Sequence, residues 1–521
     1  MALVEIRRRD RLLAFRPPAP HAVFAALTAV MMLSIVLTFA ASIPVWGTGA
    51  LIALPLVAIT ALWISGGAAT AILGLSAPTG RRNTPPKGWY PTQPTAILIT
   101  LCGENPGPMA THLAALRRQL DRADLAGTTQ IFILSDTSCA DRITAEEAAF
   151  QPLIADGTLT YRRRPVNTGR KPGNIADWLA AHGDAYTYMM VLDADSRMTA
   201  RRIRQMIWHI ARHPRLGLLQ AGIALVPGQT RFGRHQRVAA RLMSRNFGRG
   251  FAAWTGACGN YWGHNAIMRT AAFRAASHLP RLPGTAPFGG DLLSHDFIEA
   301  AWIRRAGWDV MLDPETGGSA ENAPQTLAAF HHRDRRWCQG NLQHIRLLAT
   351  PGLSPTSRIH LAAGILSYLV APAWLVIVGL IASGAVTVGG LLPLLLVAVV
   401  LALPKLCALA DWLGRARTVR RRRVAIRAWA GELGLSSLIA PLIMLRQVGA
   451  IASVCLGRDC GWKTGRTDRF PLPAGAPEAA IGLALVSLAW LTNGAGAFWL
   501  APVALPLCAA PILIRALNAQ A

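Results

Sequence analysis

The chain has 521 residues, of which 52% are apolar and only 15% are charged. Its 53 Lys and Arg against 27 Asp and Glu give a net charge of +26, which suits nucleic acid, anionic lipid or a phosphorylated substrate as a partner. The basic clusters adjoin long uncharged runs, and this arrangement argues against a soluble nucleic-acid-binding protein.

Six apolar segments are predicted to cross a membrane, because a hydrocarbon core of ~30 Å needs about 20 apolar residues. The first four hold at most one charged residue each, and the last two form a shorter pair near the C-terminus. The segments are residues 21–42, 49–76, 359–383, 386–410, 478–493 and 496–515.

Arginine-rich stretches beside these segments predict their orientation, because Lys and Arg concentrate in cytoplasmic loops. Such stretches occupy residues 5–16, 81–87 and 415–427. We therefore expect the first two spans to form a hairpin and the long middle segment to be cytoplasmic. Residues 430–456 are apolar but have basic residues on both flanks. We expect a helix along the cytoplasmic interface there, bent at Pro441, with a seventh crossing as the alternative.

The middle segment alternates between apolar runs rich in β-forming residues and amphipathic stretches. This alternation predicts a doubly wound, mainly parallel sheet covered by helices. The expected strands are residues 95–101, 130–136 and 186–195, and the expected helices are residues 112–125 and 175–183.

Three carboxylates fall at the expected strand ends, where α/β sheets bind their ligands. They are Asp136 and the pair Asp193 and Asp195, which stand one residue apart in the stretch "VLDADS". A divalent cation such as Mg²⁺ or Mn²⁺ would relieve the repulsion within this pair and keep positions open for substrate phosphates. By itself, such a pair is also common in turns and helix caps.

Further groups suit a phosphorylated sugar substrate. Lys171 lies in a basic loop with glycines, residues 162–174, whose backbone can approach an anion. Arg336 can neutralise a pyrophosphate, and the adjacent Trp337 can stack on a sugar ring. Asp296 precedes an amphipathic stretch, where a helix-capping carboxylate is the alternative interpretation.

Taken in order, these motifs resemble the membrane-integrated family 2 glycosyltransferases, which include cellulose and hyaluronan synthases. The stretches "VLDADSRMT", "YWGHNAIMR", "LLSHDFIEAAWIRRAGW" and "RDRRWCQGNL" are similar to those of the glucans biosynthesis glucosyltransferase H family, which acts in osmoregulated periplasmic glucan synthesis. Cellulose synthases have T-E-D where this chain has Ser294-His295-Asp296, and Gln where it has Arg333.

The resemblance implies a polytopic α-helical membrane protein with a cytoplasmic α/β glycosyltransferase domain of the GT-A type. It implies these domains: residues 1–89, a cytoplasmic stub and transmembrane hairpin; residues 90–345, the transferase; and residues 346–521, a transmembrane region with the interfacial helix and a gating-like loop over residues 457–475.

The resemblance also implies roles for single residues. Asp136 would contact the uridine, Asp193 the nucleotide sugar, and Asp195, with Asp193, the Mg²⁺ or Mn²⁺ ion. Lys171 and Arg336 would hold the diphosphate, Asp296 would be the general base, and Trp337 would be the acceptor platform. The remaining candidates for substrate binding are Glu104, which follows Gly103 where the family usually has Asn, and His264.

The implied function is a processive inverting transfer of glucose from UDP-glucose to the β-1,2-glucan backbone of osmoregulated periplasmic glucans, coupled to export across the bacterial inner membrane. The implied partners are UDP-glucose, the growing glucan, membrane lipid and acyl carrier protein; nucleic acid is not expected. A related transferase making another β-glucan or a glycolipid is the alternative. An alternative outside the enzymes is a transporter whose cytoplasmic domain only senses nucleotide sugar, but such a sensor would not need a general base.

Overall fold

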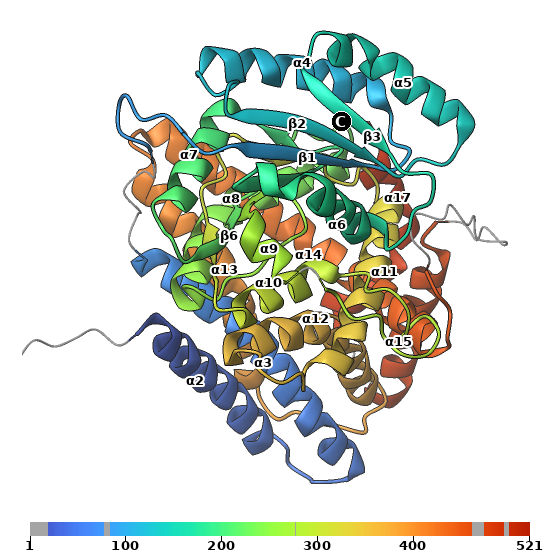
Figure 1. The fold of residues 1–521 in the computed structure, drawn as a ribbon. Coiled ribbons are helices and arrows are strands. Elements are labelled where there is room, and N and C mark those ends of the chain that lie inside the picture. The colour runs from blue at the N-terminus through green and yellow to red at the C-terminus, as the bar shows by residue number, and fades with distance from the viewer. Residues whose placement is uncertain (1–18, 78–83, 277, 461–473, 494–499, 521) are drawn as a thin grey trace, which may run out of the picture.

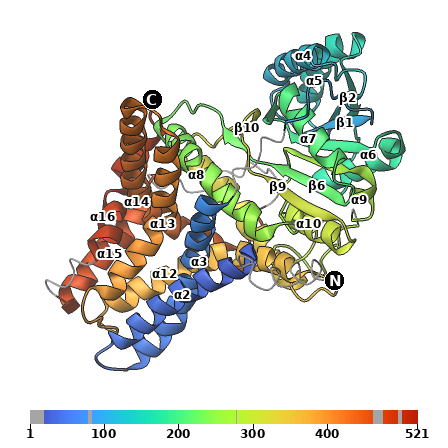
Figure 2. The same cartoon turned by 90° about the vertical axis from the view of Figure 1, so that its left-hand side faces the viewer.

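The computed structural model describes residues 19–77, 84–276, 278–460, 474–493 and 500–520. An α/β domain packs against a bundle of apolar helices, and Figures 1 and 2 show the two parts from perpendicular directions. The basic stretch at residues 5–16 lies outside the described residues, as do residues 81–83 of the second stretch.

Four of the predicted spans are long helices. They are α2 (Pro20–Ala41), α3 (Thr48–Ser76), α12 (Pro355–Ala382) and α13 (Leu392–Arg415). Helices α2 and α3 hold no Asp, Glu, Lys or Arg, and the few charged residues of α12 and α13 leave each a long apolar stretch, as a lipid-embedded helix requires. With α14 (Val419–Cys455), five described helices are long and apolar enough to cross a membrane.

The C-terminal pair of predicted spans is shorter and broken. It consists of α15 (Ala476–Asn493), α16 (Ala501–Cys508) and α17 (Ala510–Asn518). The axes of α16 and α17 differ by 67°, so the described part of the span predicted over residues 496–515 is bent and not one straight helix. Pro511 explains the break, because it has no N–H to continue the hydrogen-bond ladder of α16. Taken as one bent span, the pair would be a sixth candidate crossing.

The segment expected at the interface belongs to α14, one helix of 37 residues that continues through Pro441. Lys405 of α13 donates to Glu432 of α14 at 2.6 and 2.7 Å. Near the other end, Ser453 accepts a hydrogen bond of 2.6 Å from Arg335 of α11 (Leu327–Gln343). Both halves of α14 are thus tied to other elements, and its position along the interface stays a prediction.

The α/β domain is built on a seven-stranded sheet in the order β3-β2-β1-β4-β8-β6-β9. Strand β8 is antiparallel to both of its neighbours, and every other pair is parallel, which confirms the mainly parallel sheet. Its strands are β1 (Thr95–Leu101), β2 (Thr129–Ser135), β3 (Leu159–Arg163), β4 (Tyr188–Asp193), β6 (Leu216–Ala221), β8 (Ala266–Arg269) and β9 (Asp309–Asp313). A second sheet has the order β5-β10-β7, formed by β5 (Arg197–Met198), β10 (Ser319–Glu321) and β7 (Ala224–Leu225).

Helices cover both faces of the large sheet, because successive strand residues point to opposite sides. In β1, Ile97 and Ile99 join the core under α4 and α7, whereas Ala96 and Leu98 join the core under α6 and α10. The helices of this domain are α4 (Pro106–Arg122), α5 (Ala140–Ala155), α6 (Arg170–His182), α7 (Ala200–Ala211), α9 (Thr270–Arg274) and α10 (His295–Arg305), with short 3₁₀ turns at Gly183–Ala185 and His344–Leu347.

Two of these helices begin earlier than the sequence patterns predict. Asn105 caps α4, its side chain accepting from the backbone N–H of Gly107 at 3.1 Å. Helix α6 begins at Arg170, so the predicted loop around Lys171 is wrong, and this lysine lies in the first helical turn. Pro172 is compatible with that turn, since the first N–H groups of a helix have no partner within it.

Two further helices join the sheet domain to the bundle: α8 (Arg231–Thr255) and α11 (Leu327–Gln343). Figure 2 shows α8 running between the two parts, alongside α3. The side-chain amide of Asn246 in α8 donates to the carbonyl of Ala71 in α3 at 2.9 Å. The catalytic candidates on the sheet and on α11 are therefore held close to the apolar helices.

Candidate active site

A cavity of about 390 Å³ lies beyond the carboxyl ends of β1, β2 and β4. Every candidate site residue named from the sequence lines it, although the residues come from distant parts of the chain. They are Glu104, Asp136, Lys171, Asp193, Asp195, His264, Asp296, Arg336 and Trp337. We refer to this cavity as the donor pocket, after the nucleotide-sugar donor that the resemblance leads us to expect there.

Asp136 directly follows β2 and is held by Arg164, a residue that the sequence analysis did not single out. The Arg164 guanidinium donates to the two carboxylate oxygens of Asp136 at 2.7 and 3.0 Å, and to Asp177 at 2.8 Å. The Arg164 side chain is only 8% exposed, so it is a buried clamp rather than part of a solvated loop. This bidentate geometry fixes the direction of the Asp136 carboxylate.

Glu104 lines the donor pocket but turns back onto its own loop. Its carboxylate accepts from the backbone N–H of Cys102 at 2.6 Å. The neighbouring N–H of Gly103 donates to the Thr137 hydroxyl at 2.7 Å, and that hydroxyl donates to the buried Glu146. The ends of β1 and β2 are therefore joined by a polar network beneath the pocket.

The two carboxylates of the D-x-D pair meet different surroundings. Asp193 ends β4 and pairs with the ammonium of Lys171, which also donates to the carbonyl of Gly263 at 2.7 Å. Asp195 is partly buried, and this burial raises the pKa of its carboxyl, which the negative charges of Asp193 and Glu321 raise further.

This concentration of negative charge fits a divalent cation. Asp193 and Asp195 line the same pocket and offer the oxygen ligands that Mg²⁺ and Mn²⁺ prefer. Within the described residues, no group of three or more His, Cys, Asp and Glu side chains has metal-binding geometry. The donor set suits an ion that takes only one or two protein carboxylates and completes its shell with water and substrate phosphate.

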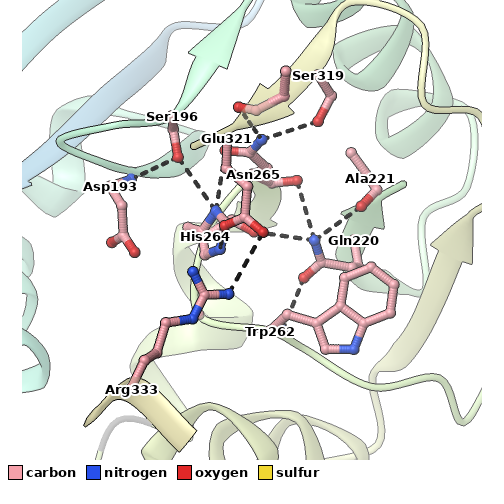
Figure 3. A network of polar contacts seen from close by, with 12 residues as sticks. Asp193, Ser196, Gln220, Ala221, Trp262, His264, Asn265, Ser319, Glu321 and Arg333 are labelled. Atoms are coloured by element: carbon pink, nitrogen blue, oxygen red, sulfur yellow. Dashed lines mark hydrogen bonds and ion pairs between the residues drawn. The ribbon is translucent and has the colours of Figure 1, made fainter. Parts of the chain in front are cut away.

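Beside the D-x-D pair, His264 and Glu321 form the centre of a polar network (Figure 3). The His264 Nε2 atom lies 3.2 Å from a Glu321 oxygen, and its Nδ1 atom lies 3.2 Å from the hydroxyl of Ser196. Burial lowers the pKa of His264, but the charges of Asp193 and Glu321 outweigh it, and the pKa is raised. Arg333 lies on the far side of Glu321, with its guanidinium nitrogen 3.7 Å from the other carboxylate oxygen.

Asp296 lies in the first turn of α10, one residue after the helix begins at His295. Burial raises the pKa of its carboxyl, although the adjacent His295 acts in the opposite direction. The His295 ring is itself paired with Glu299, at 3.2 Å. Asp296 can thus serve as a proton acceptor whose strength is increased by its surroundings.

Helix α11 supplies the arginine and tryptophan side chains of the pocket. Burial lowers the pKa of Arg336. Trp337 is 41% exposed, and the Arg333 guanidinium stands 4.3 Å from the centre of its ring. One face of the indole is thus covered by a cation.

A second cavity of about 660 Å³ adjoins the donor pocket and shares part of its lining. It continues along the bundle, past Trp63 of α3, Phe251 of α8, and His360 and Tyr368 of α12. The shared residues are Trp262, His264, Ser294, Asp296, Glu321, Arg333 and Trp337. We refer to this cavity as the bundle cavity.

The gating-like loop predicted over residues 457–475 lies mostly outside the described residues, which end at Cys460 and resume at residue 474. The backbone N–H of Cys460 donates to Gln339 of α11 at 2.9 Å, and Gln339 donates to Asp459 at 2.7 Å. Cys460, the last described residue before this gap, therefore lies beside α11, the helix that carries Arg336 and Trp337.

Arg164 and Glu321 contact predicted site residues but were missed from the sequence. Arg164 stands in a run of three arginines, and only its burial separates it from the others. Glu321 ends a strand of three residues, too short to show a period. Near this network the sequence offered His264, within the stretch "YWGHNAIMR", and Arg333, at a position where cellulose synthases have Gln.

The chain was compared with models of protein families and with solved structures. Residues 97–276 match the model of glycosyl transferase family 2, and residues 188–403 match that of glycosyl transferase family group 2. Among solved structures, the mannosyltransferase PcManGT from Pyrobaculum calidifontis, in complex with GDP-Man and Mn²⁺, is 15% identical with a TM-score of 0.45, covering 84% of this chain and 99% of that one. S. aureus TarS 1–349 in complex with UDP-GlcNAc is 12% identical with a TM-score of 0.33, covering 65% of this chain and 92% of that one.

The sheet, the helices around it and the family match define a family 2 glycosyltransferase with apolar helices that could span a membrane. A Caulobacter vibrioides protein named glucans biosynthesis glucosyltransferase H is 37% identical over 499 residues, covering 88% of this chain and 74% of the relative. The Vibrio cholerae protein of that name is 37% identical, covering 81% of this chain and 63% of the relative. The chain belongs to the glucans biosynthesis glucosyltransferase H family.

Proposed function

We propose that this protein is a processive inverting glucosyltransferase that uses UDP-glucose to build the β-1,2-glucan backbone of osmoregulated periplasmic glucans. The observation that carries the proposal is the convergence of all the predicted site residues on one pocket. The names of the relatives support a glucan product.

The donor would lie along the carboxyl ends of the strands. Asp136, directed by Arg164, would accept a hydrogen bond from the uracil. Lys171 pairs with Asp193 in the structure, so the diphosphate would compete with Asp193 for this ammonium, and Arg336 would supply the second cation. A bound Mg²⁺ or Mn²⁺ ion at Asp195 and Asp193 would neutralise charge on the departing diphosphate.

The acceptor would be activated by Asp296. Its carboxylate would take the proton of an acceptor hydroxyl while that oxygen attacks the anomeric carbon from the face opposite UDP. The bond from the anomeric carbon to the diphosphate oxygen would break at the same time. The positive charges of Lys171 and Arg336 would stabilise the negative charge on the departing UDP. A single displacement of this kind inverts the anomeric centre and needs no covalent intermediate.

Export would begin at the bundle cavity. This cavity meets the donor pocket at Asp296 and Trp337 and continues to Tyr368 of α12, so a lengthening glucan could pass from the base toward the apolar helices. The arginine-rich stretches beside the apolar segments support a cytoplasmic α/β domain and a place in the bacterial inner membrane. Acyl carrier protein is proposed as a further partner on the resemblance to the family alone.

One experiment tests the function. Purified protein in lipid vesicles is incubated with radiolabelled UDP-glucose and Mg²⁺, and the product is digested with linkage-specific glucanases. A polymer that only a β-1,2-glucanase degrades is the expected result. Another linkage, or label recovered in lipid, would instead indicate a related family 2 transferase making another β-glucan or a glycolipid. Omitting Mg²⁺ and adding a chelator should abolish the incorporation.

A further inference from the structure

Glu321, Arg333 and Trp337 form a cluster at the junction of the two cavities. All three line both the donor pocket and the bundle cavity. Asp136, Lys171 and Asp193 line the donor pocket but not the bundle cavity, whereas His360 and Tyr368 line only the bundle cavity. A sugar that touches the cluster would therefore face the donor on one side and the apolar helices on the other.

The cluster has the chemistry of a sugar-binding site. Arg333 and Trp337 are one helical turn apart on α11, and the guanidinium covers one face of the indole at 4.3 Å. The Trp337 side chain is 41% exposed and lines both cavities, so its ring is accessible to the C–H face of a sugar. Glu321 stands beside Arg333 and accepts from His264, yet a carboxylate offers about four acceptor positions, more than these two cations use.

Two other roles for Glu321 fit the observations less well. A metal ligand fits less well because the two carboxylate oxygens of Glu321 already face His264 at 3.2 Å and Arg333 at 3.7 Å. A carboxylate that only stabilises the short strand β10 would not need to line either cavity, and Glu321 lines both.

We propose that Glu321 and Arg333, together with Trp337, bind the terminal sugar of the growing glucan and present its hydroxyl to Asp296. Glu321 accepts a hydrogen bond from one sugar hydroxyl, and Arg333 holds both the Glu321 carboxylate and the Trp337 ring in place. This inference rests on the proposed function and names the acceptor side of the same site.

The test separates use of the acceptor from use of the donor. Glu321→Gln keeps the shape of the side chain but removes its charge. Arg333→Gln removes the guanidinium and introduces the residue that cellulose synthases have at this position. Glu315→Gln, an exposed glutamate of the preceding loop outside both cavities, is the matched control. For each variant, glucan synthesis is compared with hydrolysis of UDP-glucose to free glucose, in which water replaces the acceptor.

We expect Glu321→Gln to lower glucan synthesis about 10- to 100-fold, the effect of weakening a charged hydrogen bond. Its KM for UDP-glucose and its rate of hydrolysis should stay within about twofold of the wild type, since the donor contacts remain. Excess short glucan primer should restore much of the synthesis, because the loss lies in acceptor KM. Arg333→Gln should behave alike, and Glu315→Gln should match the wild type.

Two results would overturn the inference: unchanged synthesis in Glu321→Gln, or an equal loss of synthesis and hydrolysis with a raised KM for UDP-glucose. A wild-type protein that does not turn over UDP-glucose would instead contradict the proposed donor. The same comparison of synthesis with hydrolysis would then be made with the nucleotide sugar that the wild type does use.

Discussion

At the scale of single residues, the most direct prediction concerns Asp296, the proposed general base. Asp296→Asn keeps the shape of the side chain but cannot accept the proton, so transfer should fall by roughly 10²–10⁴-fold while UDP still binds. UDP release and UDP binding by calorimetry measure the two effects. Asp291→Asn, an exposed aspartate of the same segment that lines neither cavity, is the control. Turnover retained in Asp296→Asn would remove this residue as the base.

The same carboxyl predicts a pH dependence. Burial raises the pKa of Asp296 above its ordinary value of 3.8, and only the ionised form can take a proton. Activity should therefore be full above the raised pKa and be lost as the pH falls through it. A plot of kcat/KM against pH should show an acid limb above the range of an exposed aspartate, and a limb at pH 3.8 or lower would contradict the assignment.

At the scale of elements, the contact between α3 and α8 depends on glycine. A Cβ atom at Gly74 would lie 2.0 Å from the carbonyl oxygen of Asn246, whereas one at Gly67 of the same helix would meet nothing within 4 Å. Gly74→Ala should destabilise the protein by about 1–3 kcal/mol through overpacking, and Gly67→Ala should not, because alanine favours the helix. Thermal unfolding in detergent compares the two, and equal effects would contradict this close approach.

The elements also differ in how well they could be predicted. Strand β1 and the long apolar helices follow the sequence patterns closely, since each pattern spans its whole element. The first turn of α6 was missed because glycine and proline indicate a loop, although both are tolerated where a helix begins. The antiparallel position of β8 could not be predicted, because local periodicity contains no information on strand partners.

At the scale of the whole molecule, the proposed orientation can be tested with a membrane-impermeant maleimide. Cys139 is exposed on the α/β domain, and Cys455 is exposed at the end of α14. In intact cells carrying single-cysteine variants, both should be protected until the inner membrane is permeabilised, because both would face the cytoplasm. Labelling of Cys455 from the periplasmic side, with Cys139 protected, would show that α14 crosses the membrane.

The sequence by itself determined the apolar helices, the strand ends that carry Asp136 and Asp193, and nine of the side chains that line the donor pocket. These features follow from composition, period and motif, which are properties of neighbouring residues. Only the tertiary structure decided that Arg164 clamps Asp136, that Glu321 stands between His264 and Arg333, and that the donor pocket meets the bundle cavity. Those contacts join residues far apart in the chain, and their energies depend on burial, which no local pattern contains.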